Sequence, residues 1–459
     1  MTLLKPIQLK RLAFFVACAF AGAAPVYAQV FNPGDLVISI SGDGNNSGTY
    51  GDNQASPIVL EDVTTTGTIM SQLTLPQNNF TNSNGVLNYG ISGEYGSSSE
   101  GSLQLSADGQ SLVIAGYGVN AAAWNAATTS ATNAYGTQAL AQTSSILGGS
   151  VTPVSRVIAD INANGTVDTS TALYGVFNTN NPRSVSTVNG SAFYIAGQGV
   201  KGDTTQGLFI AQDGASTATA INNSTDMRTA EIYNGQLYVS TDSKQTGATG
   251  TSKGSANIAV YGSSLPTSAT TPTVLTGISN SVTLTSSANG INAAGIVNLS
   301  PENFFFANAN TMYVADGGAP KQGGLGDGGL QKWSYNGTTW VLDYTLSAGL
   351  NLVANTAASG TTGLIGLTGK VVGNQVELFT TNATIGDLNQ TYLYGINDTL
   401  SATTQPTNES FTVLDTAAAD TNIRGVAFAP VAAVPEPNSF LMLFLGMGLI
   451  AWLARRKAK

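Results

Sequence analysis

A short unit recurs along this chain: an alternating apolar run, a tight-turn dipeptide that is usually Asn-Gly or Asp-Gly, and a second alternating run. Both positions of such a turn need a positive φ, which these residues tolerate, so the pattern is a strong signal for a β-hairpin. Copies of the unit begin at Leu103, Arg183, Arg228, Gly295, Gly366 and Arg424. The last copy has only its first strand. The sequence therefore predicts an all-β protein built from repeated hairpins.

The spacing of the copies favours one architecture among the all-β folds. Successive copies start 80, 45, 67, 71 and 58 residues apart, which suits four-stranded blades with loops of variable length. Candidate strands also lie near the N-terminus, at 36–40, 56–63 and 68–75. Pairing them with the incomplete last copy, 424–430, would close a ring and remove open sheet edges. We therefore predict a β-propeller of six blades, or of seven if the 80-residue interval holds another. A pair of β-sandwiches or a β-helix is the alternative.

The first 28 residues have the three parts of a secretory signal peptide. Three positive charges lie within the first eleven residues, and an apolar run follows at 12–24. Val26 and Ala28 then supply the small residues that a signal peptidase requires, so we expect cleavage after Ala28. An uncleaved anchor is the alternative. Residues 1–28 are thus a predicted signal peptide, and 29–430 the predicted propeller.

The end of the chain has a different design. Pro435, Glu436 and Pro437 precede an apolar run at 440–454, and four basic residues end the chain. Fifteen residues rise about 22 Å in a helix, which is short of the ~30 Å hydrocarbon core of a bilayer. A transmembrane helix within 438–459 would therefore need snorkelling of its basic tail. Because basic residues stay cytoplasmic, the propeller is expected outside the inner membrane.

This tail resembles the PEP-CTERM sorting signal, in which a Pro-Glu-Pro motif, a hydrophobic helix and a basic cluster follow one another. The resemblance covers about 25 residues, and such tails also carry the label ice-binding protein C-terminal domain. It makes 431–437 a linker that holds the sorting motif Pro435, Glu436 and Pro437. It implies a Gram-negative bacterium whose exosortase-type enzyme processes the tail after signal peptidase has acted on the N-terminus. The protein would then pass from the inner membrane to the cell surface or the exopolysaccharide matrix.

Composition excludes several kinds of chemistry. Histidine is absent and the one cysteine, Cys18, lies in the predicted signal peptide. This excludes Ser-His-Asp and Cys-His nucleophilic catalysis and the usual zinc and copper sites, and it leaves carboxylate chemistry and calcium. Three of the 17 basic residues lie in the predicted signal and four in the tail, which leaves ten in the predicted propeller. Because 25 of the 26 acidic residues lie there as well, the predicted propeller has a net charge near −15. This charge disfavours nucleic acid and anionic lipid surfaces as partners.

One segment resembles the first nine positions of an EF-hand calcium loop. Asp160, Asn162, Asn164 and Asp168 occupy positions 1, 3, 5 and 9, with glycine at position 6. Position 12 is Thr171 instead of the bidentate glutamate, and the flanking residues look like strands. A hairpin with an Asn-Gly turn is therefore the simpler interpretation. Calcium is the only cofactor that the sequence suggests.

Three arginines begin copies of the unit. Arg183, Arg228 and Arg424 would lie near the start of innermost strands, facing one mouth of the propeller channel. Together they would bind an anionic sugar or another carboxylate through bidentate hydrogen bonds. The simpler interpretation is that each arginine pairs with loop carboxylates or carbonyls between blades, because residues that follow a repeat are usually architectural.

Two glutamates offer the main catalytic alternative. Glu94 and Glu100 flank a loop rich in glycine and serine, where they would serve as the acid and base of a glycosidase or simply as surface charges. No other catalytic constellation is evident in the sequence. We therefore predict an exported propeller that serves adhesion or binds carbohydrate or another matrix component. A carboxylate-dependent polysaccharide hydrolase or lyase is the alternative.

Overall fold

The computed structural model describes residues 30–45, 50–127, 139–200, 202–242, 255–279, 281–283, 296–318, 328–354 and 357–432. Residues 30–431 form one compact unit, called the body below. The predicted signal peptide and the predicted transmembrane helix, together with the Pro-Glu-Pro motif, lie outside the described residues. Within the described ranges, no helix combines the length and the hydrophobicity needed to cross a membrane.

Four separate four-stranded antiparallel sheets make up the middle and the end of the body, each with its strands in chain order. The first contains β12 (Pro182–Thr187), β13 (Ala192–Gly197), β14 (Gly207–Gln212) and β15 (Thr219–Asn222). The second contains β16 (Ala230–Tyr233), β17 (Gln236–Asp242), β18 (Ala256–Val260) and β19 (Thr273–Ser279). The third contains β22 (Pro301–Asn308), β23 (Thr311–Asp316), β24 (Gly329–Tyr335) and β25 (Trp340–Leu346). The fourth contains β26 (Thr361–Val372), β27 (Gln375–Thr384), β28 (Tyr392–Thr399) and β29 (Thr412–Thr416).

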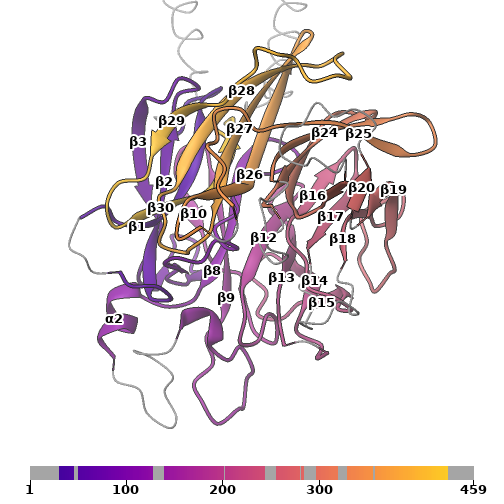
Figure 1. The fold of residues 1–459 in the computed structure, drawn as a ribbon. Helices are drawn as coiled ribbons and strands as arrows, with labels where there is room; N and C mark the ends of the chain where they lie inside the picture. Colours follow the sequence, from indigo (N-terminus) through magenta and orange to yellow (C-terminus); the bar gives the residue numbers. More distant parts are fainter. Residues whose placement is uncertain are drawn as a thin grey trace, which may run out of the picture. The chain divides into compact units, whose positions relative to one another are not determined.

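A larger, ten-stranded sheet joins the two ends of the body. One part runs in the order β30 (Thr421–Phe428), β1 (Leu36–Gly42), β2 (Ala55–Val63) and β3 (Ile69–Thr74). The other part contains β7 (Gln104–Leu105), β8 (Ser111–Tyr117), β9 (Arg156–Asn162), β10 (Val167–Asp168) and β11 (Ala172–Leu173). The short strand β6 (Ser92–Glu94) connects the two parts by pairing with β2 and β8. The body is therefore all-β and propeller-like (Figure 1).

The pairing of β1 with β30 confirms the expectation that N-terminal strands complete the last copy of the unit. The two strands are antiparallel, with Leu36 opposite Phe428 and Ser39 opposite Gly425. In Figure 1 they appear as indigo and yellow ribbons side by side. The Oγ atom of Ser39 accepts a hydrogen bond of 2.8 Å from the Gly425 N–H and donates one of 2.5 Å to the Gly101 carbonyl. One serine thus connects the first strand, the last strand and the segment before β7.

Few other elements occur in the described residues. The helix α2 (Ala121–Ala126) and the 3-10 turn η1 (Leu140–Gln142) lie in a long insertion between β8 and β9. The Asn120 side chain begins α2 by accepting a hydrogen bond of 2.9 Å from the Ala123 N–H. Two small sheets pair β4 (Phe80–Thr81) with β5 (Leu87–Asn88), and β20 (Ser281–Thr283) with β21 (Ile296–Asn298). The insertion therefore accounts for much of the 80-residue interval between the first two copies.

The hairpins form for the local reasons that the sequence suggests. Between β16 and β17, Asn234 and Gly235 have φ angles of 49° and 73°, and Tyr233 pairs with Gln236. Both turn residues are left-handed, as the two-residue turn between twisted strands requires. Alternation then directs successive side chains of each strand to opposite faces, which buries a row of apolar residues on each sheet.

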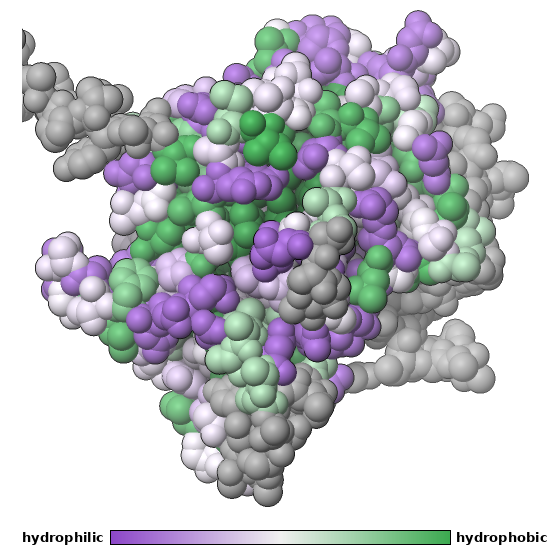
Figure 2. Space-filling model, turned by 90° about the vertical axis from the view of Figure 1, so that its left-hand side faces the viewer, coloured by the Kyte–Doolittle hydropathy of each residue, from purple (hydrophilic) through white to green (hydrophobic). Residues whose placement is uncertain are grey.

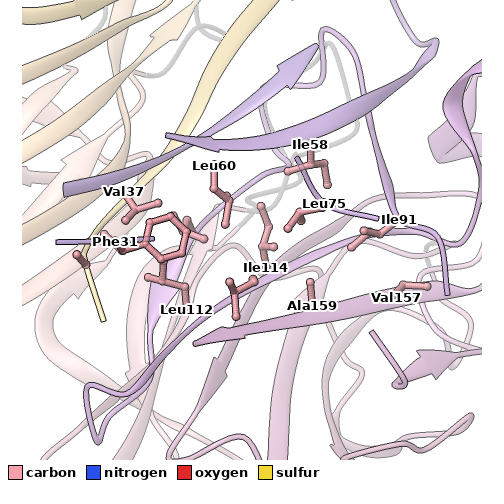
Figure 3. Close-up of a cluster of buried hydrophobic side chains, with 14 of the residues drawn as sticks. Phe31, Val37, Ile58, Leu60, Leu75, Ile91, Leu112, Ile114, Val157 and Ala159 are labelled. Atoms are coloured by element: carbon pink, nitrogen blue, oxygen red, sulfur yellow. The ribbon is translucent and has the colours of Figure 1, made fainter. Parts of the chain in front are cut away.

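Those buried rows pack between neighbouring sheets. Figure 3 shows a corresponding cluster between the two parts of the ten-stranded sheet, with Val37 and Leu60 of β1 and β2 on one side and Ile114 and Val157 of β8 and β9 on the other. The cluster side chains are almost fully buried, so truncating one of them, for example Leu60→Ala, is expected to cost about 2–5 kcal/mol of stability. Figure 2 shows the side that carries β3 and β29, where hydrophobic surface lies between hydrophilic patches. Ile69, Met70 and Val413 are the large exposed apolar residues of these two outer strands.

Candidate functional site

The first strands of the repeated units line one channel. A cavity of about 240 Å³ is bounded by residues of β7, β12, β16, β22, β26 and β30. Glu231 is the one ionisable residue that lines this cavity, and burial raises the pKa of its carboxyl to about 8. The remaining lining combines aliphatic and aromatic side chains with serine, threonine, asparagine and glutamine.

A smaller cavity lies where several of these strands begin. It measures about 30 Å³ and is called the mouth pocket below. The three arginines singled out from the sequence, Arg183, Arg228 and Arg424, all line it. Its other lining residues are Ser98, Ser99, Glu100, Ser102, Thr229, Glu302, Ile365 and Gly366. Arginines that lie up to 241 positions apart in the chain therefore meet, because each occupies the same place in its repeat.

Two of these arginines have carboxylate partners. Arg183 donates from Nη1 to the Asp226 carboxylate at 3.0 Å and from Nη2 to the Gln198 side chain at 2.6 Å. Arg228 lies 3.2 Å from Glu302 and 3.7 Å from Asp242. Burial lowers the pKa of Arg183 to about 10, and the nearby Arg228 charge acts in the same direction. Both side chains are thus positioned by partners on neighbouring strands and loops, and both remain charged at neutral pH.

Arg424 differs from the other two. Its side chain is 2% exposed, and its one hydrogen bond is a long contact of 3.4 Å from Nη2 to the Asp387 carbonyl. Within the described residues, its Nε and Nη1 groups have no hydrogen-bond partner, although the nearby carboxylates of Asp387 and Glu100 act to raise its pKa. Burial lowers the pKa of Arg424 to about 10, so the guanidinium still carries its charge at neutral pH. A buried cation with unused N–H groups is costly unless something else accepts from it.

Other unused groups gather around the same pocket. The Nε–H groups of Arg183 and Arg228 and the Ser102 hydroxyl are buried, with no hydrogen-bond partner in the part of the chain that the structure describes. Four of the five unused atoms of the mouth pocket are thus nitrogen donors of arginine, and the fifth is a hydroxyl. Because the guanidinium nitrogens cannot accept hydrogen bonds, the pocket is suited to an oxygen-rich anionic group.

The two glutamates near the pocket are buried, so the interpretation of Glu94 and Glu100 as surface charges is wrong. Glu94 is 5% exposed and accepts a hydrogen bond of 2.5 Å from the Ala141 N–H. Glu100 is 7% exposed and accepts from the Tyr117 hydroxyl, from Asn181 Nδ2 at 2.6 Å and from the Glu94 N–H at 3.3 Å. Partners from remote segments replace the water that a glutamate would otherwise need.

These two carboxyls have perturbed acidities. Burial raises the pKa of Glu94 to about 8, and the neighbouring Glu100 charge adds to the effect. Burial also raises the pKa of Glu100 to about 7, although hydrogen bonds from Tyr117 and Asn181 lower it in part. Glu100 lines the mouth pocket, and Glu94 contacts it through a backbone N–H but is not among the lining residues. Their charge therefore depends on pH in the neutral range, next to the arginines.

The segment that resembles a calcium loop forms the β9–β10 hairpin, in which Asp160 lies opposite Asp168. The Asn162 and Asn164 side-chain oxygens accept hydrogen bonds of 3.0 and 3.2 Å from the Thr166 N–H, so both amides stabilise the turn. Burial raises the pKa of Asp160 to about 6. Across the described ranges, no group of three or more acidic side chains is arranged to hold a metal ion. The calcium site stays a prediction.

Comparison with known proteins identifies the tail. The PEP-CTERM protein-sorting motif matches residues 433–457. The chain therefore carries the motif of an exported protein that an exosortase-type enzyme sorts to the cell envelope. No curated protein matches the chain in sequence.

Several solved structures are similar to the chain at low identity. A protein from Lactobacillus plantarum is 12% identical, with 86% of this chain and 99% of that chain covered, at a TM-score of 0.39. An ulvan lyase of polysaccharide lyase family PL25 is 11% identical, with 86% and 84% covered, at a TM-score of 0.36. An oligogalacturonate lyase from Vibrio parahaemolyticus is 8% identical, with 79% and 91% covered, at a TM-score of 0.32. At these identities the similarities say nothing of the activity of this chain.

Proposed function

We propose that this protein is an exported six-bladed β-propeller that binds an anionic polysaccharide at the cell surface or in the exopolysaccharide matrix. The lining of one channel by six first strands supports the blade count. The sixth blade would consist of β30 with β1, β2 and β3. The sorting motif supports the location, with signal peptidase and an exosortase-type enzyme as processing partners. The predicted transmembrane helix at 438–459 would hold the chain in the inner membrane until it is processed.

One observation carries the binding function. Arg424 is buried and charged, lines the mouth pocket and keeps two N–H groups without a partner. Arg183 and Arg228 line the same pocket, and each of them is held by a carboxylate partner. A carboxylate or sulfate group of an acidic polysaccharide would accept hydrogen bonds from Arg424, whose Nε and Nη1 groups have no hydrogen-bond partner among the described residues.

Calorimetric titration of the purified full-length chain tests the proposal. Polygalacturonate should bind, whereas neutral dextran should give no heat of binding. Arg424→Gln should weaken the binding of polygalacturonate about tenfold or more, since it removes a charge-assisted hydrogen bond. Lys370→Gln is the matched control, because it removes one positive charge from an exposed residue that does not line the pocket. Equal losses in the two variants would contradict a site at the mouth.

The polysaccharide hydrolase or lyase remains a second candidate. It is favoured by two neighbouring buried glutamates whose carboxyls have a raised pKa, Glu94 and Glu100, of which Glu100 lines the mouth pocket. Groups that titrate near neutral pH are suited to general acid–base catalysis. Incubation of the full-length chain with acidic and neutral polysaccharides should release reducing ends if this candidate is right, and Glu100→Gln should abolish that release. Absence of any depolymerisation would leave binding as the function.

A deletion tests the proposed sorting. Removal of residues 435–459 eliminates the Pro-Glu-Pro motif, the predicted helix and the basic cluster. The shortened protein should then appear in the periplasm or the medium instead of on the cell surface. Surface retention equal to that of the full-length chain would refute a role for the tail in sorting.

A further inference from the structure

The channel cavity holds a carboxyl that the proposed polysaccharide site does not use. Glu231 of β16 is the one ionisable residue among those that line this cavity of about 240 Å³. Its side chain is partly exposed, yet burial raises its pKa to about 8, so the surface that it exposes faces the enclosed channel instead of open solvent. Burial is the only cause of this shift, which means that no hydrogen bond or charge of the described residues offsets it. An uncompensated carboxylate inside a protein is costly.

The ionisable residues on the segments around β16 have other partners. Ion pairs near the mouth pocket, where the channel strands begin, engage Arg183, Arg228, Asp242 and Glu302. Tyr238 lies opposite Glu231 on β17, but its hydroxyl donates to a glutamine of its own strand. None of these groups contributes to the shifted acidity of Glu231. The cation that would balance this carboxylate is therefore absent from the described residues around it.

The rest of the cavity wall suits an ammonium group. The side-chain amides of Gln104 and Asn303 line it, and amide oxygens accept hydrogen bonds from N–H donors. Phe305 also lines it and is partly exposed. The ring lies against Gly369, where an added Cβ would come within 2.7 Å of it, so the glycine makes room for an aromatic wall. The face of such a ring attracts cations.

A ligand can enter from the end at which the channel strands finish. Ala107, which follows β7, lines the cavity and is exposed. Phe428 ends β30 and also lines the cavity, with Nζ of the exposed Lys370 lying 6.0 Å from its ring centroid. This contact shows that a ring of the wall accepts a cation. The arginines of the mouth pocket lie at the other end, so an incoming cation does not pass them.

The volume of the cavity limits the size of the ligand. An engineered cavity of about 150 Å³ holds one benzene molecule, so a cavity of about 240 Å³ has room for roughly six to ten non-hydrogen atoms. A metal ion would leave most of this volume empty and would meet a single carboxylate, whereas calcium takes several oxygen ligands. A neutral molecule would fill the space without balancing the charge of Glu231. A small organic cation does both.

We infer that the channel cavity binds a small organic ammonium ion, with its charged nitrogen on Glu231 and the rest of the molecule beside Phe305. The carboxylate accepts one N–H of the ammonium group in a charge-assisted hydrogen bond, and the amides of Gln104 and Asn303 line the same wall. The negative net charge of the predicted propeller raises the concentration of cations near the protein. This site is separate from the mouth pocket, so the inference goes beyond polysaccharide binding and does not depend on it.

Titration calorimetry of the full-length chain with benzylamine and benzyl alcohol tests the inference. The two probes have the same size and shape, but only the amine is positively charged at neutral pH. At pH 8, benzylamine should bind about tenfold more tightly than benzyl alcohol, or better. Equal binding of the two probes would show that the cavity selects for shape alone and would overturn the inference. Lack of binding by both would overturn it as well.

Proton release gives a second readout. Because the bound cation keeps Glu231 ionised, binding at pH 7 should release about one proton, which makes the binding enthalpy depend on the ionisation enthalpy of the buffer. The affinity for benzylamine should rise about tenfold per pH unit below pH 8 and level off above it. An affinity that does not change with pH would contradict a contact between the ammonium group and this carboxyl.

Three variants locate the site, and the thermal midpoint of each shows whether it is folded. Glu231→Gln keeps the size of the side chain, so it should weaken benzylamine binding about tenfold or more, abolish proton release and leave benzyl alcohol unaffected. Phe305→Leu should weaken benzylamine binding severalfold while proton release persists. Glu377→Gln is the matched control, since it removes a negative charge from β27 outside the cavity, and it should leave the affinity unchanged. Equal losses in the two glutamate variants would show attraction by net charge alone and would overturn the inference.

Discussion

A buried ion pair gives the sharpest prediction about stability. Lys332 on β24 and Asp398 on β28 are 0% exposed, and Lys332 Nζ lies 2.7 Å from the Asp398 carboxylate. Nζ also donates to the Thr399 carbonyl at 2.6 Å and to the Tyr344 hydroxyl at 3.1 Å. Asp398 in turn accepts from the hydroxyls of Tyr313 and Tyr344. The pair thus joins the third and fourth four-stranded sheets through a fully satisfied network.

Lys332→Met keeps most of the side-chain volume and removes the charge, which leaves the Asp398 carboxylate buried without its cation. Loss of one partner of a buried pair costs about 3–5 kcal/mol. With an unfolding entropy of about 2.1 cal/mol/K per residue over roughly 400 residues, this corresponds to a fall in Tm of about 4–6 °C. Differential scanning calorimetry of the full-length chain measures this fall directly.

Two further variants check the reasoning. Lys370→Met, on an exposed lysine of β26, should change Tm by less than about 1 °C, since surface substitutions have small effects. The double variant Lys332→Met with Asp398→Asn should be more stable than Lys332→Met alone, because it removes the unpaired charge. A Tm of Lys332→Met that matches that of Lys370→Met would refute the account of a stabilising network between the sheets.

Three other results are expected. Because the pKa values of Glu94 and Glu100 rise on folding to about 8 and about 7, their contribution to stability is complete below pH 4.5 and is lost as the pH rises through 7–8. Tm should therefore fall between pH 6 and pH 9, and Glu94→Gln should make that fall smaller; a fall of unchanged size would contradict the assignment. Gly67→Ala should destabilise the protein by about 1–3 kcal/mol, since its added Cβ would lie 2.3 Å from the Leu414 carbonyl oxygen. Gly85→Ala, which also has a positive φ but meets no neighbour, should cost less in the same denaturant titration. Cysteines at positions 36 and 428, which are paired across β1 and β30, should form a disulfide under oxidising conditions, and failure to do so would count against that pairing.

The strands were predictable because their signals are local. Alternating residues and a left-handed dipeptide such as Asn234-Gly235 determine a hairpin without help from distant residues. The pairing of the two ends was also predictable, because a repeat that stops after one strand needs partners from elsewhere in the chain. The arginines could be placed together for the same reason, as each occupies an equivalent position of the repeat.

The details of the site depend on contacts between distant segments. Glu100 looks exposed in a sequence of glycines and serines, yet Tyr117 and Asn181 bring the hydrogen bonds that allow its burial. Arg228 pairs with Glu302 of β22, whereas Arg424 has no ion pair among those of the described residues, so the difference depends on which segments of neighbouring copies reach each arginine. Composition alone cannot show which of these segments brings a carboxylate to its arginine.

Lys332 shows that the burial of a polar side chain within a strand also depends on distant residues. Its neighbours read as an ordinary alternating strand, in which a lysine would normally point to solvent. Its burial depends on Asp398, which lies 66 positions later and on another sheet. Burial of a polar side chain on a core face is favourable only when a hydrogen-bonding or charged partner is in place, and the neighbouring sequence does not indicate which residue that partner is.

A crystal structure of the full-length chain with galacturonic acid tests the central claim most directly. The claim predicts electron density for a carboxylate in the mouth pocket, with one oxygen about 2.7–3.2 Å from Nε or Nη1 of Arg424 and the other near Nη2. The Ser102 hydroxyl should contact a sugar oxygen in the same structure. Density for water alone around Arg424, with the sugar bound elsewhere or not at all, would contradict the claim.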